Sequence, residues 1–181
     1  MLIGLTGRIA SGKGIVADYF IEKGFRYFSL SQEVREEARR RGIEITRKNL
    51  QDLGNEIREK EGAAAWAKRI KKKIRPGNYV IDGIRNPAEV KELLKLPDFK
   101  LISVDAPQKM RYKRVISRAK GSDKKTWEGF LEMDNRDFGE NSESGQQVGR
   151  CMEMAEFKIL NDSDLDNLYK KLNGICVEIK C

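Results

Sequence analysis

Histidine is absent from the 181 residues of this sequence, and only four prolines and three cysteines occur in it. Without histidine, the chain has no imidazole to act as a general base near neutral pH or as a metal ligand. Any chemistry must therefore depend on carboxylates, lysines, arginines, hydroxyls and the backbone.

Long apolar runs are also absent, because the longest are short stretches such as YVI and KLISV. A membrane-spanning helix needs roughly 20 predominantly apolar residues, so we expect no membrane span. The N-terminal segment MLIGLTG has neither a basic region nor a small-residue cleavage site, which argues against secretion. We expect a cytoplasmic protein.

The three cysteines are Cys151, Cys176 and Cys181, and their spacing does not match that of metal ligands. We expect them to be reduced thiols of a cytosolic protein. The sequence leaves a bridge between Cys176 and Cys181 open.

Charged residues make up 35% of the chain and apolar residues 39%, a composition typical of a soluble globular enzyme with one domain. The formal net charge of +8 favours an anionic partner, which could be nucleic acid, a phosphorylated metabolite or an acidic surface. The basic runs at 39–41 and 68–75 are more typical of solvated helix faces than of binding sites.

The apolar pattern alternates between strands and helices. Strands are expected at residues 2–6, 25–30, within 76–84, at 99–106, at 156–160 and at the C-terminal end. The block from 31 to 75 has helical periodicity, and Gly42 and Gly62 divide it into about three helices. Strands separated by helices indicate an α/β fold with a parallel sheet that is covered on both faces.

The stretch GLTGRIASGKGIV, residues 4–16, places Gly7, Gly12 and Lys13 at the spacing of a phosphate-binding P-loop. A strand precedes the motif and a helix follows it, which is the context that such a loop requires. Backbone N–H groups there converge on phosphate oxygens, and the lysine adds a positive charge. The residues expected to bind ATP are Gly7, Arg8, Ala10, Ser11, Gly12, Lys13, Gly14 and Ile15.

Gly14 stands where most P-loops carry a serine or threonine hydroxyl that binds Mg²⁺. We therefore expect the metal to be held by nucleotide phosphates, water and a distant carboxylate. Asp82 is the candidate for that carboxylate, acting through water, because it follows YVI at the C-terminal edge of a strand. The alternative is an aspartate that only caps the next turn.

Arg111, Arg114 and Arg118 recur at three and four residues and therefore share one helix face. We predict that they belong to a lid helix that closes on the transferring phosphate, and that they act with Lys13 in catalysis. The alternative is a solvated basic face.

Several stretches resemble nucleoside monophosphate kinases related to adenylate kinase. SGKG (11–14) is similar to the adenylate kinase loop, SLSQEVREEA (29–38) resembles STGDxLR, and VIDGIRNPAEV (80–90) resembles DGFPR. EVREEARRRG, DGIR, DKKTWEGF and DNRDF are similar to segments of archaeal-type P-loop kinases labelled nucleotide kinase-like or dephospho-CoA kinase-like. The resemblance covers most of the chain.

This resemblance implies that Arg35 and Arg85 bind the phosphate of the acceptor. It also implies a single P-loop NTPase domain with three αβα layers. The expected parts are a core at 1–30 and 76–108, a helical acceptor-binding insertion at 31–75, a lid at 109–150 and a C-terminal core at 151–181. Ala10 and Ile15 depart from the adenylate kinase pattern, so the base of the acceptor is left open.

The sequence thus predicts an ATP-dependent kinase that requires Mg²⁺ and phosphorylates a small nucleotide-type acceptor, with a (deoxy)nucleoside monophosphate favoured. Dephospho-CoA is the alternative acceptor. A nucleic-acid-binding or regulatory P-loop ATPase is the alternative of another class, and its main support is the net charge. We expect a monomer or a homodimer.

Overall fold

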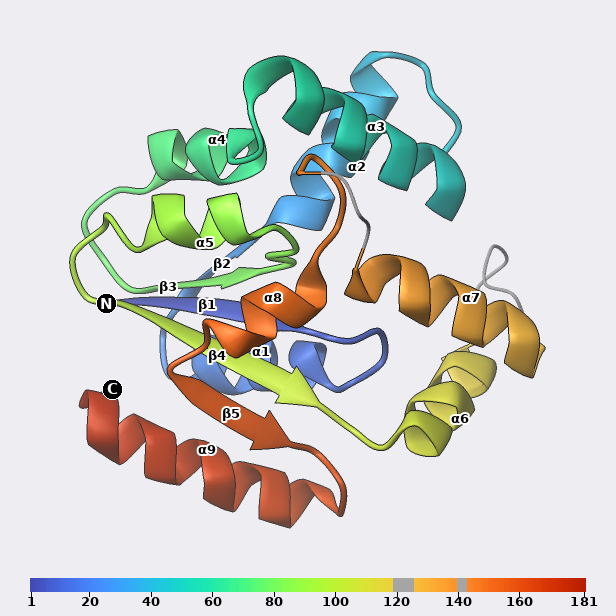
Figure 1. Cartoon of the computed structure of the whole chain (residues 1–181). Helices are drawn as coiled ribbons and strands as arrows, with labels where there is room; N and C mark the ends of the chain where they lie inside the picture. The colour runs from blue at the N-terminus through green and yellow to red at the C-terminus, as the bar shows by residue number, and fades with distance from the viewer. Residues whose placement is uncertain (119–125, 140–142) are drawn as a thin grey trace.

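The computed structural model describes residues 1–118, 126–139 and 143–181 of the chain. Its core is a sheet of five described strands in the order β2-β3-β1-β4-β5, and every neighbouring pair is parallel (Figure 1). The strands are β1 (Leu2–Gly7), β2 (Arg26–Ser29), β3 (Tyr79–Asp82), β4 (Phe99–Asp105) and β5 (Phe157–Leu160). This arrangement confirms the predicted α/β class.

The helices of the described chain connect and cover these strands. They are α1 (Lys13–Glu22), α2 (Leu30–Arg40), α3 (Arg47–Glu61), α4 (Ala65–Lys73), α5 (Pro87–Leu93), α6 (Gln108–Arg118), α7 (Trp127–Phe138), α8 (Val148–Glu153) and α9 (Leu165–Ile179). The three helices predicted between residues 31 and 75 are present as α2, α3 and α4. Ser29 and Thr46 cap the N-termini of α2 and α3 with their hydroxyls.

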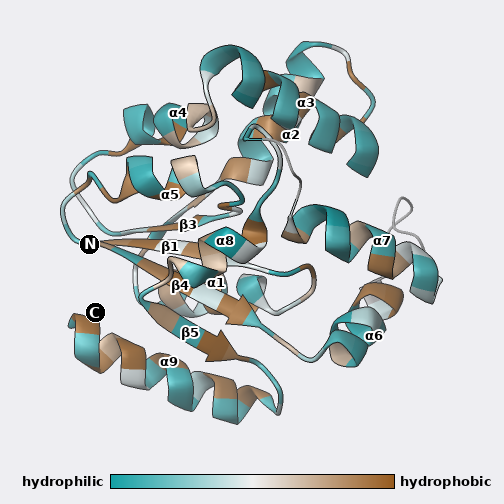
Figure 2. Ribbon diagram, in the orientation of Figure 1, coloured by the Kyte–Doolittle hydropathy of each residue, from teal (hydrophilic) through white to brown (hydrophobic). Residues whose placement is uncertain are grey.

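Two apolar clusters lie on opposite faces of the sheet. On one face, Val16 and Phe20 of α1 and Leu168 and Leu172 of α9 pack against buried strand residues. On the other face, α4, α5 and α8 contribute to a second cluster, which includes Trp66 and extends into α2 and α3. Figure 2 shows the hydrophobic strands between helices whose outer faces are hydrophilic. Burial on both sides explains why the central strands β1 and β4 are largely apolar, whereas the edge strands β2 and β5 have exposed residues.

Helices α6 and α7 form a small unit beside the C-terminal edge of the sheet (Figure 1). Val115 of α6 packs with Phe130 and Met133 of α7, and Ile9 and Ala10 of the P-loop contact this cluster. The contact seats the α6–α7 unit directly on the P-loop.

The C-terminal segment corrects the prediction of a final strand. Residues Leu165–Ile179 form one helix, α9, with Asp164 as its N-cap. Leu168, Leu172, Cys176 and Ile179 are buried at the three- and four-residue spacing of a single helix face. The β-branched residues near the end of the chain suggested a strand, but the spacing of the buried residues favours a helix.

The cysteine prediction is wrong in part. The structure pairs Cys176 with Cys181 in a disulfide at the end of α9, so these two cysteines are not free thiols. Cys151 is a free thiol, as expected. It is buried, and this burial raises the pKa of the thiol. No helix in the described ranges is both long enough and apolar enough to cross a membrane.

Candidate functional site

The P-loop runs from the end of β1 to the start of α1. Its backbone has positive φ angles at Gly7 (143°), Ala10 (56°) and Gly12 (108°). A Cβ atom at Gly7 would overlap the carbonyl oxygen of Val104 on β4, so only glycine fits there. At Ala10 the left-handed conformation costs about 1–2 kcal/mol for a residue with a side chain. This strained conformation allows the loop to turn tightly into α1.

Lys13 lies at the centre of this loop. Its Nζ donates hydrogen bonds to the carbonyl oxygens of Gly7, at 2.8 Å, and Arg8, at 2.9 Å. Burial lowers the pKa of Lys13 to about 8, with the nearby Asp82 carboxylate opposing this shift and Arg85 adding to it. A phosphate that replaces the two carbonyls would restore charge compensation to this ammonium group.

The hydroxyl of Ser11 is buried and has no hydrogen-bond partner among the described residues. The carbonyl oxygen of Ser11, in contrast, accepts from Arg114 Nη1 at 3.2 Å and from Asn161 Nδ2 at 2.9 Å. A buried hydroxyl left without a partner costs about 1–3 kcal/mol. This unmet hydrogen-bonding capacity fits a loop that receives phosphate oxygens or a hydrated cation.

Asp82 ends β3 and lies at the same edge of the sheet as the P-loop. Its Oδ1 accepts from the Gly83 amide at 2.7 Å, and its Oδ2 accepts from the Tyr27 hydroxyl at 3.4 Å. Desolvation and, next, the Asp82 charge raise the pKa of Tyr27. The described residues contain no cluster of three or more His, Cys, Asp or Glu side chains that could hold a metal alone. A cation here would depend on phosphate oxygens and water beside Asp82.

A cavity of about 330 Å³ opens between α2, α3 and the loop after β3, and we call it the helical cavity. Its volume is within the range of small-molecule sites. It is lined by Leu30, Ser31, Val34, Arg35, Ile45, Arg47, Leu50, Gln51, Gly54, Arg58, Trp66, Gly83, Arg85 and Gln146. Cationic, amide and apolar side chains therefore share one enclosed space.

Arg35 and Arg85, the two predicted acceptor-binding residues, both line the helical cavity. Arg35 is half-buried and makes no ion pair or hydrogen bond within the described chain. Arg85 Nη1 donates to Gln146 Oε1 at 2.9 Å, and its Nη2 lies 3.4 Å from the Ser31 hydroxyl. These two neutral partners hold Arg85 in place, and the carboxylate of Asp137, whose Oδ2 lies 3.8 Å from Arg85 Nη1, compensates its charge only in part.

A second cavity, of about 160 Å³, lies against the P-loop, and we call it the P-loop cavity. It is lined by Gly7, Ile9, Ala10, Lys13, Arg47, Gly83, Ile84, Arg85, Asp137 and Val148. Arg47, Gly83 and Arg85 line both cavities. Gly83 has a φ of 83°, and a Cβ there would come within 2.9 Å of the Ser31 hydroxyl. The two cavities therefore adjoin where this glycine lets the β3–α5 loop approach α2.

The predicted lid arginines contact the P-loop from α6. Arg111 is almost fully buried, and its Nη1 and Nη2 donate to the two carboxylate oxygens of Asp134 on α7 at 2.5 and 2.9 Å. Arg8 of the P-loop donates to the same carboxylate at 2.6 Å. Arg114 Nη1 donates to the carbonyl oxygens of Ala10 and Ser11. Arg118 ends α6, and its side chain lies outside the described residues.

Sequence reasoning did not identify several residues that the fold brings to the cavities. They are Arg47 and Gln51 of α3, Trp66 of α4 and Asp137 of α7, which line the cavities, and Asp134 of α7, which contacts Arg8 of the P-loop. Trp66 is fully buried and also lines the helical cavity. The spacing of Asp134 and Asp137 within MDNRDF, which puts both on one helix face, was the only local signal for this pair.

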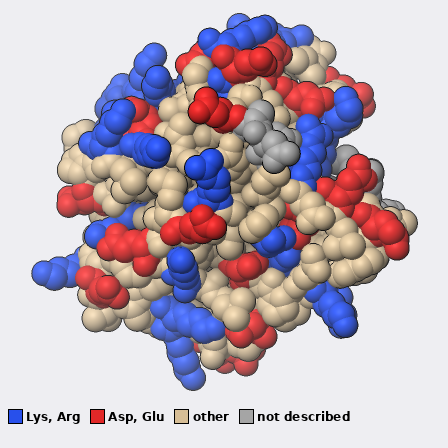
Figure 3. Space-filling model, in the orientation of Figure 1, with Lys and Arg blue, Asp and Glu red and all other residues tan. Residues whose placement is uncertain are grey.

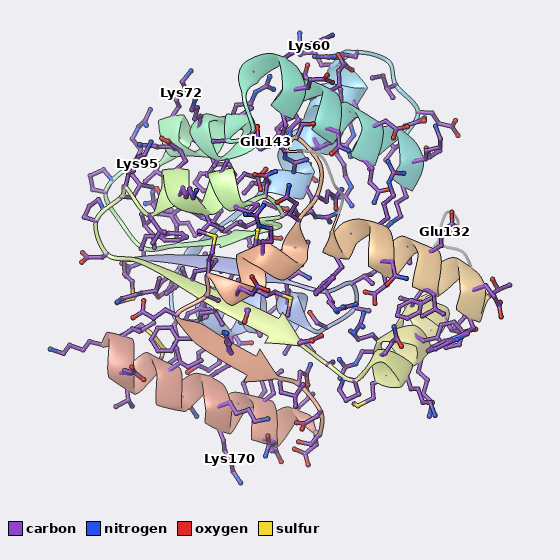
Figure 4. The ribbon with its side chains drawn as sticks, in the orientation of Figure 1. Lys60, Lys72, Lys95, Glu132, Glu143 and Lys170 are labelled. Carbon is purple, nitrogen blue, oxygen red and sulfur yellow. A yellow bond between two sulfur atoms is a disulfide. The ribbon has the colours of Figure 1, made fainter. Side chains whose placement is uncertain are left out.

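The basic runs are largely compensated by acidic neighbours. Glu37 accepts from Arg40, Arg41 and Arg69. The hydrogen bond from Arg40, and next that from Arg41, lower the pKa of Glu37 to about 2. Lys71 pairs with Glu92, and Lys73 with Glu33. On the face shown in Figure 3, basic and acidic groups are interspersed. Figure 4 shows Lys60, Lys72 and Lys170 at the periphery, pointing outward. These runs therefore behave as solvated helix faces.

Known proteins are similar to this chain in sequence and in fold. Residues 3–148 match a family described as AAA domain. A UPF0200 protein from Pyrococcus horikoshii is 33% identical over 189 aligned residues, which cover 99% of this chain and 97% of that protein.

Two solved structures share the fold at low sequence identity. A gluconokinase from Sinorhizobium meliloti matches with a TM-score of 0.56 and 14% sequence identity. A shikimate kinase from Acinetobacter baumannii, in complex with shikimate, matches with a TM-score of 0.57 and 13% sequence identity. Each match covers 98% of this chain and 93% of the other. The chain therefore belongs to the AAA-domain family and to the UPF0200 proteins, with the parallel α/β fold of P-loop kinases.

Proposed function

We propose that this protein is an ATP-dependent kinase that requires Mg²⁺ and phosphorylates a small nucleotide-type acceptor, with a nucleoside or deoxynucleoside monophosphate favoured. The phosphate donor occupies the P-loop and the P-loop cavity. The acceptor occupies the helical cavity, so that α2, α3 and α4 act as the acceptor-binding insertion. Helices α6 and α7 act as the lid.

The junction of the two cavities carries this proposal. Arg47 and Arg85 line both cavities, so one pair of cations faces the donor and the acceptor sides together. Transfer of a phosphoryl group needs two anionic substrates held end to end with their charge compensated. Arginine suits this task because its planar fork binds phosphate oxygens in pairs.

The acceptor is held by its own phosphate. Arg35 has no ion pair among the described residues, so it can bind an anion without losing a carboxylate partner. Arg85 is hydrogen-bonded by neutral groups and has only a distant carboxylate, Asp137 at 3.8 Å, so its charge is also largely available to an anion. Gln51, Trp66 and the apolar residues of the same cavity then surround the rest of the molecule. An acceptor with a phosphate at one end and a flat ring at the other matches these surroundings.

In the reaction, an anionic oxygen of the acceptor phosphate attacks the γ-phosphorus of ATP. The bond from that phosphorus to the β–γ bridging oxygen breaks, and ADP leaves with the electron pair. Lys13, Arg85 and Arg114 compensate the charge on the transferring group, whereas the buried Arg111 is paired with Asp134 and holds α6 on α7. Mg²⁺, when bound with the nucleotide beside Asp82, supplies further charge compensation. No general base is needed, because the attacking oxygen carries no proton at neutral pH.

Dephospho-CoA is the second candidate acceptor, and one observation favours it. Leu30, Val34, Ile45 and Leu50 form an apolar part of the helical cavity wall that would accommodate a pantetheine arm. In that case a ribose hydroxyl is the nucleophile and gives up a proton. The two acceptors therefore differ in whether a proton acceptor is required near the junction.

The test measures ADP release with ATP and Mg²⁺ across ribonucleoside and deoxyribonucleoside monophosphates and dephospho-CoA, with GTP as a second donor. Stimulation by a monophosphate, abolished in Lys13→Ala, supports the proposal. Stimulation by dephospho-CoA alone replaces the favoured acceptor with the second one. If every acceptor fails while Lys13→Ala abolishes ATP binding, the loop binds nucleotide and the kinase proposal is wrong.

A further inference from the structure

Helix α7 carries two buried carboxylates, Asp134 and Asp137, that contact different parts of the molecule. Asp134 is 1% exposed and Asp137 is 5% exposed. They are separated by three positions in an α-helix, so they project from one face, roughly one turn apart. Burying two like charges on one helix is costly unless each has its own partners.

The partners of Asp134 belong to the donor side. Its carboxylate accepts from Arg8, in the P-loop, and from Arg111, on α6. Arg111 also donates through Nε to the carbonyl oxygen of Ala106, directly after β4. Asp134 therefore holds the P-loop and α6 in one network.

Asp137 itself lines the P-loop cavity, and its partners lie on the acceptor side and at the junction of the two cavities. Its Oδ2 accepts from Arg47 Nη2 at 2.6 Å, and its Oδ1 accepts from Gln51 Nε2 at 2.6 Å. Both donors are on α3 and line the helical cavity. Arg85 Nη1 lies 3.8 Å from the same carboxylate.

Asp137 determines how Gln51 is presented to a ligand. An ionised carboxylate only accepts hydrogen bonds, so the NH₂ group of Gln51 must face it. The other end of the amide, Oε1, has no donor within the described chain and is available as a hydrogen-bond acceptor. Asp137 likewise fixes one edge of the Arg47 guanidinium group.

We propose that Asp137 is a positioning residue of the acceptor site, supplied by α7, and that it makes α3 respond to occupation of the P-loop. This inference rests on the proposed function for its assignment of donor and acceptor. Because a single rigid helix bears both carboxylates, a nucleotide that steadies Arg8 and Asp134 also steadies Asp137. The side chains of Arg47 and Gln51 are then already oriented for binding before the acceptor enters.

The test compares Asp137→Asn with wild type and with Asp52→Asn as a matched control. Asp52 also joins α3 to α7, through Arg136 at 3.0 Å, but lies at the surface outside both cavities. The first readout is hydrogen exchange of residues 47–61 with and without Mg²⁺ and ADP. The second is the KM and kcat for the monophosphate that the wild type uses best.

We expect ADP to slow exchange in α3 of the wild type and Asp52→Asn. In Asp137→Asn this protection of α3 is lost, while protection of α1 remains. The acceptor KM rises at least tenfold, whereas the Kd for ADP does not rise, because the substitution removes a negative charge from the lining of the P-loop cavity. Asp137→Glu, which keeps a carboxylate, recovers part of the protection.

The proposal is overturned if ADP fails to protect α3 in the wild type, or if Asp137→Asn retains either wild-type α3 protection or the wild-type KM. Should Asp137→Asn fail to fold, Arg47→Lys provides the same comparison, because lysine keeps the charge but not the planar fork. Hydrogen exchange needs no acceptor. Absence of turnover in the wild type therefore contradicts the proposed function, while α3 protection still tests the role of Asp137.

Discussion

Arg47 of α3 and Asp137 of α7 are 90 positions apart in the sequence, yet Arg47 Nη2 lies 2.6 Å from Asp137 Oδ2 where the two cavities adjoin. Both side chains are largely buried. A buried ion pair contributes little net stability, because desolvation offsets attraction, but breaking one partner costs several kcal/mol. This pair is therefore better explained by the placement of charge at the cavity junction than by stabilisation of the fold.

The depressed pKa of Lys13 predicts that nucleotide affinity depends on pH. Lys13 has a pKa of about 8 in the free protein because its ammonium group is buried. A bound phosphate favours the charged form and raises that pKa. The nucleotide phosphates are already ionised above pH 7. We expect the association constant for ADP, measured by titration calorimetry, to fall about tenfold between pH 7 and pH 9.

Two controls examine this assignment. Lys13→Arg keeps a charged group at all these pH values, so the slope above pH 8 should disappear even if affinity is lower. Without ligand, Lys13 has a pKa of about 8 in the folded protein and of 10.5 in the unfolded chain. Between these two pH values, the unfolded chain therefore binds more protons than the folded protein. The free energy of unfolding should therefore rise with pH in this window, relative to Lys13→Met. A pH-independent Kd in the wild type would contradict the prediction.

Asp82→Asn should weaken the response to magnesium. The substitution removes the negative charge beside the P-loop but keeps an acceptor for the Gly83 amide. We expect the Mg²⁺ concentration for half-maximal ADP release to rise at least tenfold, while metal-free ADP binding is unchanged or tighter. Asp105→Asn is the matched control, since Asp105 ends β4 at the same edge of the sheet. If Asp105→Asn has the larger effect, the metal carboxylate is misassigned.

Arg35→Ala should raise the acceptor KM by tenfold or more, which is about 1.4 kcal/mol or more of binding free energy. The physical reason is that Arg35 lines the helical cavity and has no carboxylate partner in the part of the chain that the structure describes. Arg39→Ala removes an exposed arginine from the same helix and should leave KM within twofold of wild type. Equal KM values for the two variants would remove Arg35 from the acceptor site.

Gly54→Ala should stabilise the protein and impair acceptor binding. Glycine inside a helix costs roughly 0.5–1 kcal/mol relative to alanine. A Cβ at Gly54 has room, since its nearest neighbour is Arg58 Nη1 at 3.6 Å, but it enters the lining of the helical cavity. We expect Tm to rise by about 1–4 °C and the acceptor KM to increase.

Gly174→Ala separates these two effects. Gly174 lies inside α9, a Cβ there has open space, and it lines neither cavity. It should gain similar stability without any change in KM. If Gly54→Ala also leaves KM unchanged, the glycine is not retained for ligand binding.

Reduction of the Cys176–Cys181 disulfide should lower stability without affecting nucleotide binding. The bridged residues are five positions apart, so the loop they close is short and its contribution is at most about 2 kcal/mol. We expect dithiothreitol to lower Tm in the wild type but not in Cys181→Ser. A change in the Kd for ADP on reduction would show that α9 is coupled to the P-loop.

Local sequence patterns predicted the parts of the site that lie within one strand–loop–helix unit. Gly7, Gly12 and Lys13 are read from a single short stretch, because the chemistry of the loop is largely that of its own backbone. Arg35 and Arg85 were found in the same way, from short segments that resemble known kinases, and the structure places both on one cavity. Their roles remain predictions.

The remaining part of the site depends on contacts between distant elements. Arg47 is the first residue of α3, and Asp137 lies near the end of α7. The sequence around each of them contains no motif that distinguishes it from the many other charged residues of the chain. Only the packing of α7 between the P-loop and α3 selects them. The same limitation explains why a final strand was wrongly predicted. The apolar C-terminal residues fit the spacing of a strand as well as that of a helix, and the packing of α9 against the sheet selects the helix.

Lys13, Arg35, Arg47 and Arg85 place four positive charges around the two cavities, and Asp137, which pairs with Arg47, compensates only part of this charge. The low-dielectric walls of the cavities focus the electric field outward and accelerate the diffusional encounter with anions. The same field does not distinguish a substrate from any other doubly charged tetrahedral anion. Inorganic sulfate and phosphate should therefore compete for both cavities, and association rates should fall steeply as ionic strength rises.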